Sequence, residues 1–589
     1  MRIAILNKDK CQPRQCSKEC HKFCPRVRTG DETILFGEDG KAVISEELCA
    51  GCGICVKKCQ FGAIMIIGLP ESLEHPAHRY GQNGFMLFGL PVPQQGKVTG
   101  ILGPNGIGKS TAVQILSGNL IPNFGEKKAD WETVLEHYAG TALYDYFKIA
   151  ASGKLKVSQK PQYVDMIPKA FKGKTSELLE KANTGGNLDA IVERLEMKDI
   201  IDRDIKALSG GELQKVAIAA CASKDADFYF FDEISSYLDI YQRINAARLI
   251  QDLAKEKNKS VLVVEHDLAI LDMLTDTVHI AYGQPAGYGV MTLPKTVRVG
   301  INQYIKGYLP EENMRIRSEA IRFETHPPKE GTDIKTILTY DSFSKKFENV
   351  FELDARGGSI KEGEVLGIVG PNGTGKTTFA KILAGEIEPD TGDVGIGVRI
   401  AYKPQYIKAE TPIRVRDFLM DIADNFGSSY YEVEIARPLR LDMLYDSLLT
   451  DLSGGELQRV AIAACLSREA DFYILDEPSA HLDVEQRAIV TRVISRFAES
   501  HSKTAMVVDH DIYMIDMISR RLIVFEGTPS KSGIANSPAG MKAGMNKFLS
   551  NLDITFRRDE ETKRPRVNNY MSRLDREQKE NGEYYYTGK

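Results

Sequence analysis

The sequence predicts an α/β protein in which two related parallel-sheet domains follow a small, cysteine-rich α+β domain. Three observations support this fold class. Eight of the ten cysteines lie within the first 59 residues. A Gly-Pro-Asn-Gly-x-Gly-Lys motif occurs at 103–109 and again at 370–376, each time between an apolar run and a helical pattern. Apolar runs that end in Asp-Glu, at 228–233 and 472–477, are typical of buried parallel strands.

Length and composition indicate several globular domains. The chain has 589 residues, about four times the roughly 150 residues of one domain. Hydrophobic residues make up 42% and charged residues 27%, which excludes a collagen-like or wholly disordered chain. The net charge is −5, but residues 1–30 contain eight lysines and arginines and only two acidic residues. An anionic partner would therefore bind at this segment. Without a long apolar run or a secretory signal, the sequence predicts a cytoplasmic protein that does not enter a membrane.

The N-terminal cysteines form two runs of four. The second run, with x2-x2-x3 intervals, has the bacterial ferredoxin spacing, in which three thiolates bind one [4Fe–4S] cluster and the fourth reaches a neighbouring cluster. The sequence therefore predicts a ferredoxin-like domain with two [4Fe–4S] clusters. By this crossing rule one cluster takes Cys24, Cys49, Cys52 and Cys55, and the other takes Cys11, Cys16, Cys20 and Cys59.

Two other frameworks compete for these cysteines. A disulfide scaffold fits their density but not the missing secretory signal. Structural zinc fits a set of four thiolates but not the x2-x2-x3 run. The remaining two, Cys221 and Cys465, lie in identical Ala-Ile-Ala-Ala-Cys contexts and are predicted to be buried structural thiols.

The repeated glycine-rich motif has the strand–loop–helix context of a P-loop, which predicts two tandem P-loop domains. Backbone N–H groups of such a loop converge on phosphate oxygens, its lysine reaches the outer phosphates, and the next Ser or Thr reaches Mg²⁺. The predicted phosphate-binding residues are Gly103, Asn105, Gly106, Gly108, Lys109, Ser110 and Thr111 in the first domain, and Gly370, Asn372, Gly373, Gly375, Lys376, Thr377 and Thr378 in the second.

Acidic residues at the strand ends complete the predicted chemistry. Asp232 and Asp476 are predicted to lie on the Mg²⁺ side of each P-loop, and Glu233 and Glu477 to polarise the water that attacks the γ-phosphate. Two histidines, His266 and His510, end another apolar strand in each half. A histidine in that place is often structural, but its repetition at the same 244-residue offset as the carboxylates favours a γ-phosphate contact.

With these motifs, residues 76–285 and 333–528 resemble the ABC-type ATPases. Leu-Ser-Gly-Gly-Glu at 208–212 and 452–456 is similar to their signature motif, and 235–239 and 479–483 to their D-loops. In that family the signature of one half closes on the nucleotide of the other, so the resemblance implies two composite sites that hydrolyse ATP with Mg²⁺. It adds as site residues Gln162 and Gln405 of the Q-loops, Ser209 and Gly211 opposite Lys376, Ser453 and Gly455 opposite Lys109, and Tyr80 and Phe347 stacked on adenine.

For Tyr80 and Phe347, packing of the ring in the protein core is the alternative to stacking on adenine.

Two cysteine runs ahead of twin ATPase halves are similar to a narrower group, the RNase L inhibitor family of ribosome-recycling ATPases from archaea and eukaryotes. This resemblance implies ATP-driven splitting of the ribosome after termination or rescue. It also implies that a class-one release factor or Pelota is the partner and that the protein, a monomer, stays on the small ribosomal subunit. The expected domains are an iron–sulfur domain at 1–75, ATPase halves at 76–285 and 333–528, a hinge at 286–332, and a C-terminal hinge and tail at 529–589.

The first half carries an insertion. The P-loop lysines are 267 residues apart whereas the Ser-Gly-Gly motifs are 244 apart, so about 23 extra residues lie near 127–156. Asp130 is predicted to cap one helix and Gly140 to end it before a second helix begins. This helix-loop-helix, surrounded by lysines, resembles the family's small-subunit contact; a solvated pair packed on its own domain is the other interpretation. The lysines are Lys127, Lys128, Lys148, Lys154 and Lys156.

Two other functions remain open from the sequence. The ATPase motifs equally fit the ATPase subunit of a membrane transporter, although fused halves and an iron–sulfur module favour a soluble mechanical role. Ferredoxin spacing equally fits an ATP-coupled iron–sulfur electron carrier. The arginines of the C-terminal tail, at 557–566, are expected to be solvated surface or part of a hinge.

Overall fold

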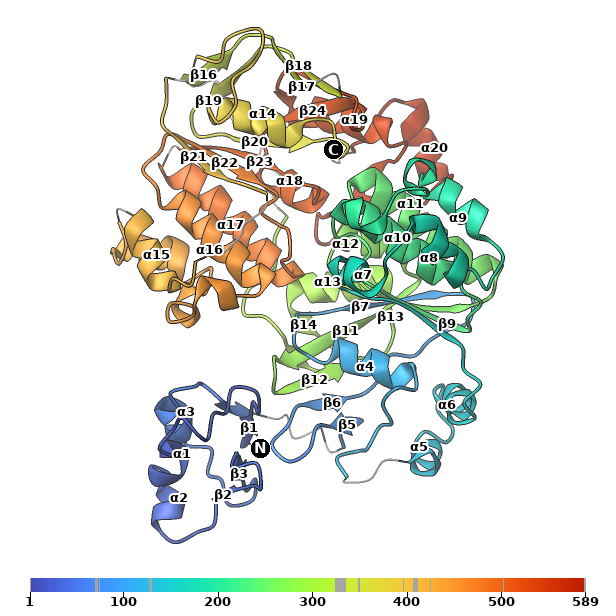
Figure 1. Cartoon of the computed structure of the whole chain (residues 1–589), viewed down its shortest axis with the longest axis vertical. Helices are drawn as coiled ribbons and strands as arrows, with labels where there is room; N and C mark the ends of the chain where they lie inside the picture. Colours follow the sequence, from blue (N-terminus) through green and yellow to red (C-terminus); the bar gives the residue numbers. More distant parts are fainter. Residues whose placement is uncertain are drawn as a thin grey trace.

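The computed structural model describes residues 2–68, 73, 75–126, 130–323, 335–347, 350–395, 397–405, 411–423, 425–501 and 503–586. Its N-terminal part contains two antiparallel strand pairs (Figure 1). Strand β1 (Arg2–Leu6) pairs with β4 (Ile64–Gly68), and β2 (Ile34–Phe36) pairs with β3 (Ala42–Ile44). Short helices carry or adjoin the cysteines: α1 (Glu19–Lys22), α2 (Pro25–Arg28) and α3 (Ile54–Lys58). The predicted ferredoxin-like α+β domain is confirmed.

The two following halves share one sheet topology of nine strands. In the first half the order is β5 (His78–Arg79), β6 (Met86–Phe88), β12 (Tyr288–Met291), β11 (Thr277–Gln284), β7 (Val98–Leu102), β10 (Ser260–Val264), β9 (Phe228–Asp232) and β8 (Val157–Lys160), with β13 (Lys295–Thr296) beside β11. In the second half it is β17 (Phe343–Phe347), β18 (Phe351–Ala355), β25 (Ser532–Ala535), β24 (Arg521–Thr528), β20 (Val365–Val369), β23 (Thr504–Val508), β22 (Phe472–Asp476) and β21 (Ile400–Lys403), with β26 (Ala539–Gly540) beside β24. The central strands are parallel and buried, as their unbroken apolar runs predict.

Helices surround each sheet and repeat in the same order. In the first half they are α4 (Lys109–Leu116), α7 (Ile167–Ala170), α8 (Thr175–Ala182), α9 (Leu188–Arg194), α10 (Gly210–Ala222), α11 (Ile240–Glu256), α12 (Leu268–Leu274) and α13 (Val297–Lys306). In the second they are α14 (Lys376–Leu383), α15 (Val415–Ile422), the π-helix η4 (Tyr431–Ala436), α16 (Gly454–Leu466), α17 (Val484–His501), α18 (Ile512–Ile518) and α19 (Met541–Asn551). The chain continues through the hairpin of β27 (Phe556–Arg558) and β28 (Pro565–Val567) to α20 (Arg573–Glu580).

Two of the expected domain boundaries cut through these sheets. The boundary at 285 falls inside the β11–β12 hairpin, in which Gln284 pairs with Tyr288. The boundary at 528 falls inside the equivalent β24–β25 hairpin, in which Thr528 pairs with Ser532. The chain forms a tight turn at each of these boundaries, because the strand after it returns to the same sheet. We therefore propose that the halves extend at least to 291 and 535.

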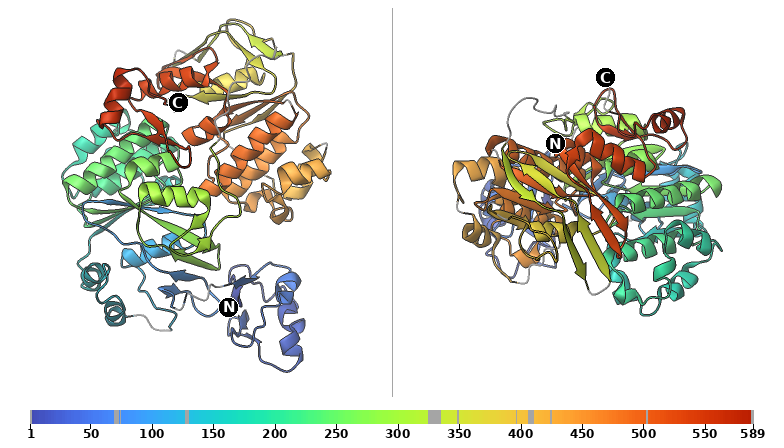
Figure 2. Two further views of the ribbon diagram at one scale, coloured as in Figure 1. Left: turned by 180° about the vertical axis from the view of Figure 1, so that it is seen from behind. Right: turned by 90° about the horizontal axis from the view of Figure 1, so that it is seen from above.

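The predicted insertion is a helical pair that lies apart from the iron–sulfur domain (Figures 1 and 2). Helix α5 (Trp131–His137) begins at Asp130, whose carboxylate accepts a hydrogen bond from the N–H of Thr133 at 2.8 Å. Helix α6 (Tyr144–Ala151) follows. Both predicted helices are thus present, and Val134 and Phe147 fix them on the first half's core. Of the five predicted lysines, Lys127 and Lys128 lie outside the described residues; Lys148, Lys154 and Lys156 are exposed.

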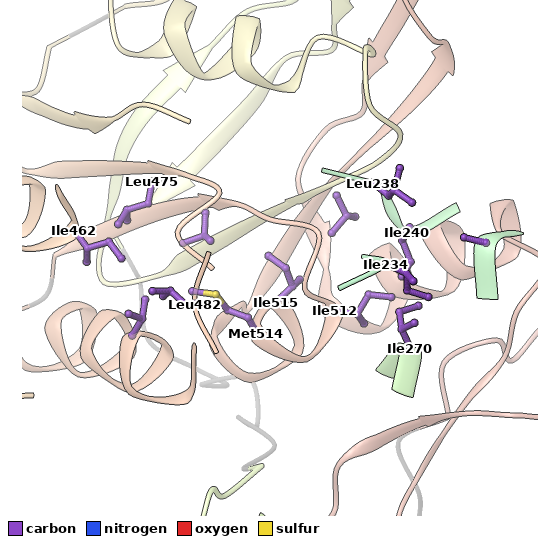
Figure 3. Packing of buried hydrophobic residues seen from close by; sticks show 14 of the residues in the cluster. Ile234, Leu238, Ile240, Ile270, Ile462, Leu475, Leu482, Ile512, Met514 and Ile515 are labelled. Atoms are coloured by element: carbon purple, nitrogen blue, oxygen red, sulfur yellow. The ribbon is translucent and has the colours of Figure 1, made fainter. Parts of the chain in front are cut away.

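One apolar cluster spans both halves. Ile234, Leu238 and Ile270 of the first half belong to the same buried cluster as Ile512 and Ile515 of the second (Figure 3). Because each of these side chains is almost fully buried, the contact between the halves is a continuous core rather than a wet interface.

The iron–sulfur domain is docked on the first half by Asn83. Its amide N–H₂ donates to the carbonyl oxygens of Ala4 and Ile44 at 3.0 and 2.9 Å, its Oδ1 accepts from the N–H of Ile44 at 2.8 Å, and its carbonyl accepts from Leu6. An ion pair between Arg79 and Glu46 lies nearby. With the amide fully satisfied inside the contact, Asn83 fixes the orientation of the domain.

Arginines of the C-terminal segment hold both halves. Arg566 binds Asp272 of α12 through two hydrogen bonds of 2.8 and 3.0 Å, and Arg564 adds a third of 3.1 Å. Arg558 binds Asp516 of α18 through two bonds of 2.6 and 2.7 Å. The two aspartates are equivalent positions, 244 residues apart. The expectation of solvated surface is wrong for Arg558, Arg564 and Arg566. These arginines form hydrogen bonds with buried aspartates of both halves.

Candidate functional site

Both P-loops lie between a central strand and a helix, as predicted. In the first, β7 leads into the loop and α4 starts at Lys109, whose ammonium donates to the carbonyls of Gly103 and Pro104 at 2.8 and 2.9 Å. Gly108 has φ +86°, and a Cβ there would lie 2.7 Å from the ring of Phe85. This glycine is therefore required both by its conformation and by the close approach of the ring.

The second P-loop has the same geometry and a clear cation position. Lys376 donates to the carbonyls of Gly370 and Pro371 at 2.9 and 2.7 Å. The hydroxyl of Thr377 donates to Oδ2 of Asp476 at 2.8 Å. The other oxygen of this buried carboxylate, Oδ1, has no partner among the described residues. A buried, unpartnered carboxylate oxygen beside a P-loop hydroxyl fits Mg²⁺.

Each predicted catalytic glutamate accepts a hydrogen bond from the Q-loop glutamine of its own half. Gln162 donates from Nε2 to Oε1 of Glu233 at 2.7 Å, and Nε2 of His266 lies 3.8 Å from the same carboxylate oxygen. In the second half Gln405 makes the equivalent bond to Glu477 at 2.7 Å, and His510 lies 3.7 Å away. Glutamine, glutamate and histidine, which are far apart in sequence, therefore converge in each half.

Burial controls the charges of these groups. Burial, followed by repulsion from Glu233, raises the pKa of Asp232 to about 7. Burial and the neighbouring Asp476 raise the pKa of Glu477. Burial and the nearby P-loop lysines hold the pKa values of His266 and His510 well below their ordinary range, so both imidazoles are neutral at pH 7. In each half the neighbouring aspartate and glutamate carboxylates repel each other, and a bound cation would reduce this repulsion.

Each signature motif starts a helix with a complete capping box. Ser209 begins α10 and accepts from the N–H of Glu212, whose carboxylate accepts from the N–H of Ser209 in return; Ser453 and Glu456 repeat this at α16. The second glycine of each motif, Gly211 or Gly455, lies close to the D-loop carbonyl of its own half. The glycine N–H groups of each motif take no part in the capping box, and N–H groups at a helix N-terminus suit an anion.

The D-loops join the halves head to tail. Asp239 of the first half accepts from the N–H of Asn372 in the second P-loop at 2.8 Å, and Asp483 accepts from Asn105 in the first at 3.4 Å. The rings of Tyr237 and His481, at equivalent D-loop positions, lie 6.0 Å apart. Each P-loop is therefore touched by the opposite half, as composite sites require.

Both predicted adenine-stacking residues are partly exposed. Tyr80 is 43% exposed and its hydroxyl lies 3.3 Å from that of Thr111. Phe347 is 38% exposed at the end of β17. Neither ring is fully buried in the core, so both exposures are compatible with the predicted stacking.

One of the two predicted cysteine sets lines a cavity, and three members of the other set lie near one another. Four cysteines line one cavity beside the apolar residues Leu6 and Ile64: Cys11, Cys16, Cys20 and Cys59. Burial and then the charges of Cys49 and Cys52 raise the pKa of Cys55 to about 11, so these three thiols are neighbours. Cys24 lies in the same buried cluster as Cys55. Thiols arranged around a cavity fit an iron–sulfur cluster, which thiolates hold.

Several residues that build these sites lie outside the predicted motifs. Glu265 accepts from the N–H and hydroxyl of Ser235 at 3.1 and 2.7 Å, and so anchors the first D-loop; Asp509 does the same for Ser479. A lysine two residues before each Q-loop glutamine also lies outside them. The available signal was repetition, since all of these residues recur at the same place in both halves.

Models of three domain families match the chain. The ABC transporter family matches residues 93–236 and 353–480. A possible Fer4-like domain in RNase L inhibitor matches residues 1–32, and the 4Fe-4S binding domain matches residues 42–65. The two cysteine runs fall within the last two matches.

Full-length relatives decide the family. Translation initiation factor RLI1 of Saccharomyces cerevisiae is 45% identical over 599 residues, covering 99% of this chain and 98% of the relative. The chain belongs to the RNase L inhibitor family. A second relative, described as an uncharacterized ABC transporter ATP-binding protein of Methanocaldococcus jannaschii, is 53% identical over 593 residues, with 100% and 98% coverage. As a member of this family the chain is an ATPase that binds nucleotide with Mg²⁺ and carries an iron–sulfur domain.

A solved structure described as a model of ribosome-bound archaeal Pelota and ABCE1 superimposes with a TM-score of 0.92 at 51% identity, covering 100% of this chain and 99% of that chain. The tandem arrangement of the RNase L inhibitor family is therefore present from end to end. Among the described residues, no helix combines the length and apolar character needed to cross a bilayer.

Proposed function

We propose that this chain is an ATP-driven ribosome-recycling factor. Closure of its two halves splits the ribosome into subunits after termination or rescue, with a class-one release factor or Pelota as partner. The protein acts in the cytoplasm as a monomer and stays on the small ribosomal subunit. The observation that carries this proposal is similarity along the whole chain, iron–sulfur segment included, to an ABCE1 protein described on the ribosome with Pelota.

For hydrolysis, we assign each residue by its position. Lys109 and Lys376 would turn from their loop carbonyls to the outer phosphates. The metal, held on the side of Thr377 and Asp476 and on the equivalent side of Ser110 and Asp232, would neutralise phosphate charge. Glu233 and Glu477, each oriented by a Q-loop glutamine, would polarise the attacking water, and the neutral histidines beside them would donate to the γ-phosphate. Support comes from the convergence of these groups in both halves.

We further propose two [4Fe–4S] clusters with the crossed ligand sets expected above. Anaerobically prepared protein should contain about eight iron atoms per chain, since each cubane holds four. Cys59→Ser should lower this to about four, because its thiol lines the cavity that we assign to one of the two clusters. Cys465→Ala, a buried thiol in the second half, is the matched control and should retain eight. Measurement is by elemental analysis; bound zinc, or four irons in the unaltered chain, contradicts the proposal.

Splitting itself is tested on sucrose gradients. Incubating ribosomes with the purified chain, ATP and a class-one release factor or Pelota should convert the ribosome peak into subunits. A nonhydrolysable ATP analogue should leave the protein sedimenting with the small subunit. Intact ribosomes under both conditions would contradict the proposal, and copurification with a permease or redox cycling coupled to turnover would favour the transporter or electron-carrier interpretation.

The same gradients test the helical insertion. Because Val134 and Phe147 of this segment are core residues, charge reversal is a cleaner change than deletion. Lys148→Glu with Lys154→Glu should weaken cosedimentation with the small subunit, since both lysines are exposed and would face RNA phosphates. Lys206→Glu, an exposed change elsewhere on the first half, is the control. Equal cosedimentation of both proteins would leave the insertion without a ribosomal role.

A further inference from the structure

In each half, a lysine is the last residue of one edge strand of the nine-stranded sheet. Lys160 is the last residue of β8 and Lys403 the last of β21. Their side chains are 0% and 1% exposed, although lysine is among the residues least often buried. Both lie in the sequence Lys-Pro-Gln, whose glutamine is the Q-loop residue.

Each ammonium binds the backbone of the neighbouring Asp-Glu pair. Lys160 donates from Nζ to the carbonyl oxygens of Asp232 at 2.6 Å and Glu233 at 3.0 Å. Lys403 donates to the carbonyl oxygens of Asp476 at 2.7 Å and Glu477 at 3.4 Å. Burying an ammonium group costs free energy unless its protons are hydrogen-bonded. Here they are donated to the carbonyl oxygens of two consecutive residues.

Those peptide groups have an unfavourable conformation. Glu233 and Glu477 have φ of +49° and +48°, in the left-handed region that residues other than glycine rarely adopt. Such a conformation persists only where surrounding bonds impose it. A second donor reaches each glutamate carbonyl: Gln214 of α10 at 2.6 Å and Gln458 of α16 at 2.7 Å.

The Lys-Pro-Gln segment therefore holds each glutamate at two points. The lysine binds its main-chain oxygen, and the glutamine two residues later binds its carboxylate at 2.7 Å in both halves. The intervening proline restricts φ and so limits the freedom between the two contacts. The position of the carboxylate is thus set from both ends by one short segment.

We propose that Lys160 and Lys403 are positioning residues for ATP hydrolysis, which hold the strained Asp-Glu backbone so that the glutamate carboxylate stays where it polarises water. This inference rests on the roles proposed above for Glu233 and Glu477. Neither lysine touches the nucleotide side of the P-loop; each acts through the glutamate of its own half.

The test uses the full chain, prepared anaerobically, with Lys160→Met and Lys403→Met combined. Methionine has a similar length and is apolar, so it suits a buried position but cannot donate. Turnover should fall at least tenfold, while equilibrium binding of MgATP changes less than threefold because the P-loops are intact. Nucleotide retained after gel filtration should be ATP, not ADP. Lys198→Met, whose side chain is 73% exposed on the first half, is the matched control and should behave as the unaltered chain.

Several outcomes decide between the explanations. Undiminished turnover, or equal losses of turnover and ATP binding, would overturn the positioning role. If the methionine variants do not fold, Lys160→Arg with Lys403→Arg, which keeps the charge and donors, decides: retained turnover supports the role and parallel loss of binding overturns it. Glu233→Gln with Glu477→Gln is assayed alongside. If the double glutamine variant still hydrolyses ATP, the roles proposed for Glu233 and Glu477 are wrong. If the double glutamine variant is inactive but the lysine variant still hydrolyses ATP, only the positioning role of the lysines is wrong.

Discussion

Replacing Glu233 and Glu477 together by glutamine should lower ATP turnover by about 10²–10⁴-fold, the range of a lost general base. Glutamine keeps the size of the side chain and its contacts with the Q-loops, but it cannot accept a proton from water. ATP binding should persist, because the P-loop lysines lie on other elements. The two halves should then remain closed on unhydrolysed ATP.

Phosphate release and retained nucleotide measure this directly. The retained nucleotide should be ATP, and the ribosome gradients should show the protein held on the small subunit. Glu193→Gln, whose side chain is 75% exposed on α9, is the control and should turn over normally. Phosphate release at the control rate by the double variant would rule out the assigned role.

Asp272→Ala should be the most destabilising single change outside the sites. Asp272 is 2% exposed and binds both Arg564, which is fully buried, and Arg566. Removing the carboxylate leaves the fully buried Arg564 without its charge partner, at a cost of about 3–5 kcal/mol, while Arg566 keeps only its 3.8 Å ion pair with Asp559. For a domain of this size, that lowers the thermal midpoint by roughly 10 °C.

Asp252→Ala is the matched control on the same half. Its ion pair with Arg194 is about half exposed, so its loss should cost about 0–1 kcal/mol. Calorimetry of both variants gives the comparison. Equal midpoints would mean that the C-terminal segment contributes little to holding the halves together.

Local repetition made much of this structure predictable. The two P-loops, the strand-end carboxylates and the capped signature helices each occupy one continuous stretch, and their pattern appears twice, so periodicity and spacing sufficed. The two insertion helices occur only once but were predictable from local signals, since Asp130 caps the first and Gly140, with positive φ, follows its end. The roles of the site residues stay predictions until the variants above are measured.

Long-range pairs were not predictable. Arg566 and Asp272 are 294 residues apart, and nothing in a basic, polar tail indicates which buried acid it will meet. Asn83 looks like an ordinary turn residue until the iron–sulfur domain packs on it. Lys160 reads as a polar interruption of a strand, because its bonds go to peptide oxygens, which every sequence has. The hairpins after β11 and β24 were not predictable, because only the sheet shows that the strands after the turns return to it.

The apolar cluster shared by the halves has a thermodynamic consequence. Two separate proteins lose translational and rotational freedom on meeting, at a cost of about 4–15 kcal/mol. In this chain that loss occurs once, during folding, because Ile234 and Leu238 already share a core with Ile512 and Ile515. The effective concentration of each signature helix near the opposite P-loop is then fixed by covalent connection and by this core. ATP binding therefore does not have to pay for bringing the halves together, and more of its free energy is available for work on a bound partner.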